Sequence, residues 1–318
     1  MADTSSTQKE VIIIGGGPAG LAAATAAVRQ LYRCVLFDSG VYRNANATHM
    51  HTVPGWDHQN PATFRAKARQ DILARYDTIQ FEDVAVTEVK KLDDGTFSAK
   101  DAQGRLWTAP KIVLAVGVRD IAPDIPGYTD LWTKRIFHCL FCHGYEERGA
   151  PSVGVLAIDV MLADSGRALH VTHMAERLAS SVRIYTNGNT ELASQITANL
   201  KGDKPYTVES RKIVQMSPGT ATPTSVIVRL QDGTEHEEGF MTHAPRTETN
   251  GPFAQQLGLE LTATGDIKVA PPFQTTNVPG VFAAGDCSTM MKQVTSAMFS
   301  GGMALVAATM NVIPQMPK

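Results

Sequence analysis

The sequence predicts an α/β protein built from two units in which parallel strands alternate with helices. Its 318 residues correspond to about two domains of roughly 150 residues each. Near the N-terminus the β-branched run Val11–Ile14 meets a glycine-rich turn and then an alanine-rich segment, the pattern of a buried strand followed by a helix. A second strand–helix–strand pattern lies within residues 152–186.

Composition excludes several classes of protein. Hydrophobic residues make up 43% and charged residues 19%, which is a globular balance and not a disordered one. The net charge of −2 gives no sign of a nucleic-acid-binding or polybasic membrane surface. Four cysteines are too few for a secreted disulfide scaffold. The N-terminus lacks a signal-peptide pattern and no apolar run reaches 18 residues, so we expect a soluble, cytoplasmic protein without a membrane span.

The N-terminal turn predicts a dinucleotide site. Gly15 allows the tight turn, Gly17 lets the backbone approach a pyrophosphate, and Gly20 lets helix and strand pack closely. A second strand, Tyr32–Phe37, ends in Asp38, at the spacing expected of a carboxylate that binds ribose hydroxyls. The alternative is a purely structural glycine turn.

The remaining elements follow from periodicity and turn residues. In the first part of the chain we expect a helix over Pro61–Tyr76, a hairpin of Val84–Val89 and Thr96–Lys100 around Asp94-Gly95, a strand over Lys111–Val116 and a boundary near residue 120. In the middle part we expect strands Ser152–Ile158 and Val182–Thr186 around the helix Ala168–Ala179, then strands Ile213–Met216 and Ser225–Leu230 and a polar stretch to Thr242. A helix over Thr295–Thr309 follows the short strand that ends in Gly285-Asp286.

Cys139 and Cys142 are spaced for a small redox disulfide at the start of a helix-like segment. Half of a zinc site or two buried thiols are the alternatives. Zinc would need two further ligands at motif spacing, and His138 and His143, which flank the pair, are too close in sequence to close a tetrahedral site. We therefore expect no metal.

Three motifs in order resemble the low-molecular-weight thioredoxin reductases over nearly the whole chain: Gly15–Gly20, the Cys139–Cys142 pair, and Gly285-Asp286 followed by residues 292–297. The resemblance implies the class-II architecture of pyridine nucleotide-disulfide oxidoreductases, with two interleaved Rossmann-like domains. Residues 1–120 and 244–318 would form the FAD-binding domain, and residues 121–243 an inserted CxxC domain. It also implies non-covalent FAD and a homodimer.

The resemblance assigns roles residue by residue. Cys142 would be the flavin-proximal sulfur, and Cys139 the outer sulfur that meets a substrate thiolate. The residues expected at FAD are Gly15, Gly17, Pro18, Ala19, Gly20, Asp38, Gly285, Asp286, Gln293 and Val294.

One departure from the reductases affects the function. Where they carry a second glycine-rich turn, this chain has Ala157–Ala163, and Tyr185–Asn189 supplies no pair of cations for a 2′-phosphate. The NADPH site is therefore expected to be degenerate. Together with the sequence Cys-Leu-Phe-Cys-His-Gly-Tyr-Glu, this resembles the gliotoxin and holomycin dithiol oxidases. That branch oxidises the dithiol of a small natural product to a disulfide and passes the electrons through FAD to O₂, giving H₂O₂.

The histidines are candidates with open alternatives. His143 stands where the reductases carry an acidic acid–base residue, and an imidazole with a reference pKa near 6.5 suits thiol deprotonation; a structural role is the alternative, and His138 is a weaker candidate. His49 and His51 would line the flavin or the substrate, or be ordinary loop residues.

Two other functions compete with the dithiol oxidase. One is a thioredoxin reductase that uses NADPH or another electron donor. The other is a flavin-binding redox sensor or structural protein without turnover. The remaining thiols, Cys34 and Cys287, are expected to be bystanders.

Overall fold

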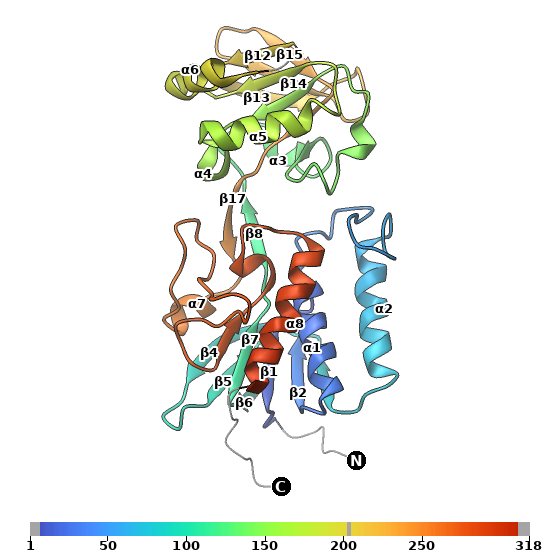
Figure 1. Ribbon diagram of the computed structural model, residues 1–318, viewed down its shortest axis with the longest axis vertical. Coiled ribbons are helices and arrows are strands. Elements are labelled where there is room, and N and C mark those ends of the chain that lie inside the picture. The colour runs from blue at the N-terminus through green and yellow to red at the C-terminus, as the bar shows by residue number, and fades with distance from the viewer. Residues whose placement is uncertain (1–6, 202–204, 311–318) are drawn as a thin grey trace. The chain divides into compact units, whose positions relative to one another are not determined.

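The chain divides into two compact units, Met1–Arg119 with Thr247–Lys318 and Asp120–Arg246. The computed structural model describes residues 7–201 and 205–310 (Figure 1). Most of the polar N-terminal segment expected to lack a signal peptide lies outside these ranges. Within them, no helix is long and apolar enough to cross a membrane.

The first unit is built on a five-stranded sheet to which both ends of the chain contribute. Its strand order is β18-β7-β1-β2-β3, and neighbouring strands are parallel. The strands are β1 (Val11–Ile14), β2 (Cys34–Phe37), β3 (Ile79–Glu82), β7 (Lys111–Leu114) and β18 (Val281–Ala283). Their central members are buried on both faces, which accounts for the continuous apolar runs in the sequence.

Two helices with small residues pack closely on one face of this sheet: α1 (Pro18–Arg29) and α8 (Val294–Met310) (Figure 1). A Cβ on Gly301 would lie 2.0 Å from the carbonyl oxygen of Ala19, so the helices approach only because this position is glycine. Helix α2 (Pro61–Leu73) begins at Asn60, whose side chain accepts a hydrogen bond from the Ala62 N–H.

The opposite face carries an antiparallel sheet of β4 (Val86–Lys91), β5 (Phe97–Asp101) and β6 (Leu106–Ala109), with the short helix α7 (Phe253–Gln256). The expected hairpin around Asp94-Gly95 joins β4 to β5. Trp107 is buried against Phe37 in an edge-on ring contact, which ties this sheet to the central one.

The second unit is also built on a parallel five-stranded sheet, in the order β12-β11-β10-β16-β9. Its strands are β9 (Ile136–Phe137), β10 (Val153–Leu156), β11 (Val182–Tyr185), β12 (Tyr206–Glu209) and β16 (Phe240–Thr242). The helices are α3 (Tyr128–Leu131), α4 (Asp159–Leu162), α5 (Ser165–Ala175) and α6 (Thr190–Asn199). An antiparallel sheet of β13 (Ile213–Pro218), β14 (Val226–Leu230) and β15 (Glu235–Glu238) completes it. The segments that cross between the units, β8 (Val118–Ile121) and β17 (Arg246–Thr249), pair with each other. The two expected Rossmann-like α/β units are therefore confirmed.

The polar stretch to Thr242, to which the sequence analysis assigned no element, contains the strands β15 and β16. Glu238 illustrates why the sequence did not predict these strands. Its side chain is fully buried and pairs with Arg183 and with the hydroxyl of Tyr185, because a buried carboxylate needs such partners. Glu238 is therefore a polar residue that forms part of the core.

Candidate functional site

The glycine turn between β1 and α1 contains two kinds of glycine. Some are required by the turn itself, and one borders free space. Gly15 has a φ of +120°, and a Cβ there would lie 2.1 Å from the Ala115 carbonyl oxygen. A Cβ on Gly20 would lie 1.8 Å from the Gly15 carbonyl oxygen. A Cβ on Gly17 would have no described atom within 4 Å. Gly15 and Gly20 therefore hold the turn itself, and Gly17 borders free space.

That free space adjoins the N-terminus of α1, where Gly17 is the N-cap, no side chain caps the helix, and Pro18 opens the first turn. Uncapped N–H groups at the positive end of the helix dipole are what a pyrophosphate needs. Asp38, at the end of β2, accepts hydrogen bonds from the Gly40 N–H and the Tyr42 hydroxyl. A Cβ on Gly16 would lie 2.1 Å from the Asp38 carboxylate, so this glycine makes room for the acid.

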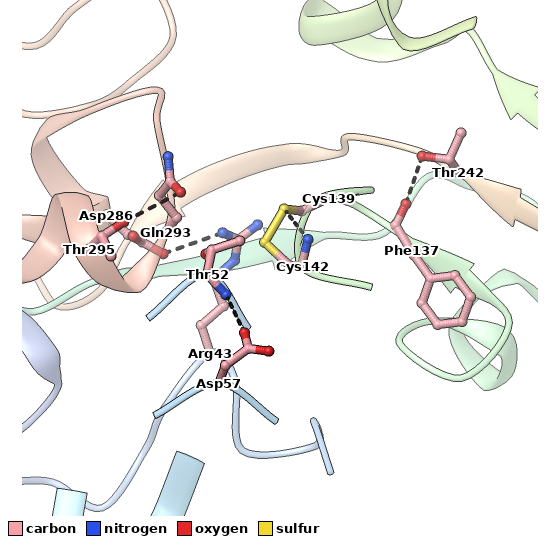
Figure 2. Close-up of a disulfide and its surroundings, with 10 residues drawn as sticks. All are labelled: Arg43, Thr52, Asp57, Phe137, Cys139, Cys142, Thr242, Asp286, Gln293 and Thr295. Carbon is pink, nitrogen blue, oxygen red and sulfur yellow. Dashed lines mark hydrogen bonds and ion pairs between the residues drawn. A yellow bond between two sulfur atoms is a disulfide. The ribbon is translucent and has the colours of Figure 1, made fainter. Parts of the chain in front are cut away.

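The C-terminal motif meets the same turn. Gly285, with a φ of +76°, lies where a Cβ would be 2.9 Å from the Cβ of Ala19, and its N–H donates to Ser300 Oγ at 2.9 Å. Asp286 Oδ2 lies 3.3 Å from Arg43 Nη1 (Figure 2). Residues from both ends of the chain thus converge around the N-terminus of α1.

Lys292 fixes the loop between this motif and α8. Its Nζ donates to Asp266 Oδ1 at 2.6 Å and to the carbonyl oxygens of Asp286 and Thr289. Both partners of this ion pair are largely buried. Gln293 follows directly, with its Oε1 3.5 Å from Thr295 Oγ1 (Figure 2). Neither Arg43 nor Lys292 was assigned a role from the sequence, because the carboxylates with which they form ion pairs lie far away in the chain.

The cysteine pair directly follows β9 and is oxidised: Cys139 and Cys142 form a disulfide with Sγ atoms 2.02 Å apart (Figure 2). The N–H of Cys142 donates to Cys139 Sγ at 3.1 Å. Thr242 anchors the preceding strand by donating to the Phe137 carbonyl oxygen at 2.9 Å. The expected helix-like segment is a single turn closed by hydrogen bonds from the N–H groups of Cys142 and His143 to the Cys139 carbonyl oxygen. A short 3₁₀ segment, Tyr145–Glu147, follows it.

His143 belongs to the same turn as the disulfide, since its backbone N–H donates to the Cys139 carbonyl oxygen at 2.9 Å. Its ring stacks on Phe137, with centroids 3.9 Å apart, and its Nε2 lies 3.1 Å from Glu147 Oε1. His138 lies instead beside Trp132, with ring centroids 5.9 Å apart.

The loop of His49 and His51 holds a third histidine that the sequence analysis missed. His51 Nε2 lies 3.1 Å from His58 Nδ1, and the ring of His49 stacks on that of His58 at 4.1 Å. Two apolar residues of the loop, Met50 and Val53, are in the same hydrophobic cluster as Val294. The loop is therefore anchored next to the start of α8.

The carboxyl edge of the second sheet is occupied by a polar trio, of which Tyr128 and His243 are buried and Asp159 is partly exposed. Ligands of doubly wound sheets bind at this edge, at the point where the strand order reverses, which here lies between β10 and β16. Asp159 follows β10 with a φ of +63°, and its Oδ2 lies 3.4 Å from Nε2 of His243, which follows β16. Nδ1 of His243 lies 2.7 Å from the Tyr128 hydroxyl.

Burial lowers the pKa of His243, and the opposing effect of Asp159 does not offset it. The ring is fully buried. Asp120 adds a second acidic charge that favours protonation. His243 is therefore a neutral imidazole at neutral pH.

A sequence profile of the pyridine nucleotide-disulphide oxidoreductases matches residues 9–301. The chain belongs to this family. Among its relatives, "Thioredoxin reductase aclD" of Aspergillus oryzae is 48% identical over 93% of this chain and 94% of its own length. "Thioredoxin reductase sirT" of Leptosphaeria maculans is 41% identical over 92% and 90%.

Solved structures give the same assignment. An oxidoreductase from Agrobacterium tumefaciens has a TM-score of 0.82 and 31% identity, covering 95% of this chain and 98% of its own. The structure titled HlmI has a TM-score of 0.80 and 25% identity, covering 95% and 92%. The expected resemblance to thioredoxin reductase-like enzymes is confirmed.

Like the thioredoxin reductase-like members of this family, the protein is a flavoprotein with FAD as its cofactor. The first unit fits this group. It offers open space at Gly17, an uncapped helix N-terminus at Pro18, and the acidic side chains of Asp38 and Asp286 at the ends of two strands. FAD bound there supplies an acceptor for two electrons.

The trio around His243 gives this family member a pH-dependent stability. The lowered pKa in the folded state means that the unfolded chain takes up a proton below pH 6.5 that the folded chain does not. We expect the free energy of unfolding to fall as pH drops below about 6.5. Urea unfolding between pH 8 and pH 5 should show a shallower decline for His243→Gln. His173→Gln, which removes an exposed histidine of the same unit, should keep the wild-type slope, and equal slopes in all three proteins would contradict the assignment.

Proposed function

We propose that the protein is an FAD-dependent dithiol oxidase. It would close an intramolecular disulfide in a small-molecule natural-product dithiol through Cys139 and Cys142, with O₂ as the electron acceptor and H₂O₂ as the product. The observation that carries this proposal is the carboxyl edge of the second sheet, where Asp159 and His243 stand in place of a phosphate cradle.

Two features of that edge oppose NADPH. The carboxylate of Asp159, three residues after β10 ends, would repel a pyrophosphate where glycine N–H groups would bind it. After β11, the turn side chains serve the fold: Asn187 accepts from the Ile213 N–H and Asn189 caps α6. Arg183 is already paired with Glu238. A 2′-phosphate needs cations that can meet it, and residues 186–189 contain none.

The thiol chemistry balances without a nicotinamide. One substrate thiolate attacks Cys139 Sγ, forms a mixed disulfide and releases Cys142 as a thiolate. The second substrate thiolate attacks the substrate sulfur of the mixed disulfide, which closes the product disulfide and releases the Cys139 thiolate. Two protons leave the substrate, and two electrons reach the cysteine pair. FAD held by the first unit would supply the acceptor for these two electrons, and their transfer to O₂ with two protons would give H₂O₂.

His143 would accept the proton of the attacking thiol. Its ring stacks on Phe137, the residue two positions before Cys139, at 3.9 Å. An imidazole transfers protons readily near neutral pH. His138, His49 and His51 remain weaker proposals as residues lining the substrate or the flavin.

The names of the fungal relatives favour a second candidate, a thioredoxin reductase that takes electrons from NADPH or another donor. The oxidase and the reductase differ in the donor of the electrons that reduce the flavin. Under nitrogen, we expect a small dithiol to bleach the flavin absorbance near 450 nm and NADPH at sub-millimolar concentration to leave it unchanged.

In air, an oxygen electrode and a peroxide assay should record one O₂ consumed and one H₂O₂ formed per disulfide. Flavin reduction by NADPH at a rate matching turnover, or dithiol oxidation without O₂ uptake, would overturn the proposal in favour of the reductase. Absence of bleaching by both reagents would favour a redox sensor.

A homodimer is part of the proposal. Three apolar side chains on α8 are exposed in the single chain: Phe299, Val306 and Met310 are 61%, 38% and 64% exposed. They follow one another at spacings of seven and four residues, so they lie on one face of the helix. A second copy of the chain is the partner that we infer for this face.

A further inference from the structure

Glu147 is an acidic neighbour of the turn that holds the Cys139–Cys142 disulfide. No sequence motif pointed to it. It lies four residues after His143, and its Oε1 is 3.1 Å from Nε2 of that ring. Its Oε2 is 2.6 Å from the hydroxyl oxygen of Thr224. The side chain of Glu147 is 10% exposed and that of His143 37%. Both oxygens of the Glu147 carboxylate therefore have partners, and Glu147 is the more buried member of the Glu147–His143 pair.

Glu147 is ionised at neutral pH. Burial alone would raise the pKa of its carboxyl group, but the hydrogen bonds from His143 and Thr224 outweigh burial and lower the pKa. An ionised carboxylate can only accept hydrogen bonds. The facing Nε2 of His143 must therefore carry the hydrogen, and in the neutral ring Nδ1 then holds the lone pair.

Two interactions of the described chain orient the ring of His143, one with Phe137 and one with Glu147. Phe137 stacks against the ring with an interplanar angle of 24°, which restricts its tilt. Glu147 fixes its rotation within that plane. Together they leave Nδ1 as the ring atom that neither of them engages.

We propose that Glu147 is a positioning residue that locks His143 in the tautomer protonated at Nε2, so that Nδ1 accepts the thiol proton. The kinetic consequence of this role rests on the oxidase function proposed above.

Nitrogen NMR of histidine-labelled protein tests the tautomer directly and needs no turnover. We expect His143 of the wild type to carry hydrogen at Nε2, and Glu147→Gln to give a mixture of tautomers. Thr224→Val, which frees one carboxylate oxygen, serves as a second variant if Glu147→Gln does not fold. A wild-type ring protonated at Nδ1 would overturn the proposal. This readout stands even if the electron donor proves to be NADPH, so the two failures are distinguishable.

Anaerobic stopped-flow reduction of the flavin by dithiol tests the kinetic part. We expect Glu147→Gln to slow it by on the order of 10- to 100-fold, the usual cost of losing an orienting partner, and His143→Ala by about 10² to 10⁴. Adding Glu147→Gln to His143→Ala should cost nothing more, because Glu147 acts through the ring. Glu235→Gln, at an exposed carboxylate paired with Arg229 in the same unit, should match the wild type. A full additional loss in the double variant would mean that Glu147 does not act through His143.

Discussion

Serine in place of either Cys139 or Cys142 is expected to abolish turnover, with a loss on the order of 10⁴-fold or more. The mixed disulfide forms only if Cys139 is attacked while Cys142 leaves as a thiolate, so neither variant can begin the exchange. The disulfide joining the two residues in the structure is the oxidant that both variants lack. Dithiol-driven H₂O₂ formation measures the loss.

The two variants should differ in their absorbance spectra. Cys139→Ser leaves Cys142 free as a thiolate, and a thiolate next to oxidised flavin gives a long-wavelength charge-transfer band. Cys142→Ser should lack the band. The opposite result would reverse the order of the two sulfurs, and Cys34→Ser is the matched control, because that thiol is buried within β2 and should leave the spectrum unchanged.

Valine in place of Gly17 is expected to give a folded protein that does not retain FAD. The structure leaves the position of a Cβ free of described atoms within 4 Å, so the fold tolerates a side chain there. The same side chain would fill the space through which a pyrophosphate reaches the N–H groups of α1. Losing two charge-assisted hydrogen bonds at about 1.5–3 kcal/mol each weakens binding on the order of 10²-fold or more. Flavin content after purification and a reconstitution titration measure this.

Gly20→Ala provides the contrast. Its Cβ would meet the Gly15 carbonyl oxygen at 1.8 Å, so this variant should be destabilised as a protein, with or without FAD. Circular dichroism and thermal unfolding separate the two outcomes. Gly17→Val that binds FAD as tightly as the wild type would contradict the placement of the pyrophosphate.

The sequence was sufficient where the chemistry is local. The turn at Gly15, Gly17 and Gly20 combines a strand, glycines and a helix within a few residues, and periodicity identifies such units. The disulfide ring follows from the spacing of Cys139 and Cys142 alone. The interleaving of the domains was implied by the family resemblance, which rests on the three motifs along the chain.

The sequence was insufficient where function depends on partners that are distant along the chain. Asp159 indicated only that a glycine turn was missing, and its contact with His243 depends on β10 and β16 being neighbours in the sheet. The contact of Arg43 with Asp286 likewise joins the two ends of the chain. Glu147 could have been found, because residues four apart often pair, but without the fold nothing distinguished it from Glu146.

Because the two unpaired thiols are buried, alkylation followed by mass spectrometry can measure the redox state of the Cys139–Cys142 pair. Cys34 and Cys287 are fully buried, and burial raises the pKa of their thiols to about 12 and about 11. Alkylating reagents attack the thiolate, so at pH 8 neither residue should react in the native protein. Iodoacetamide should then add no label to the oxidised chain and two to the reduced chain. Intact-protein mass spectrometry of samples quenched during turnover would report the fraction of cysteine pairs that are reduced at each moment, independently of flavin colour.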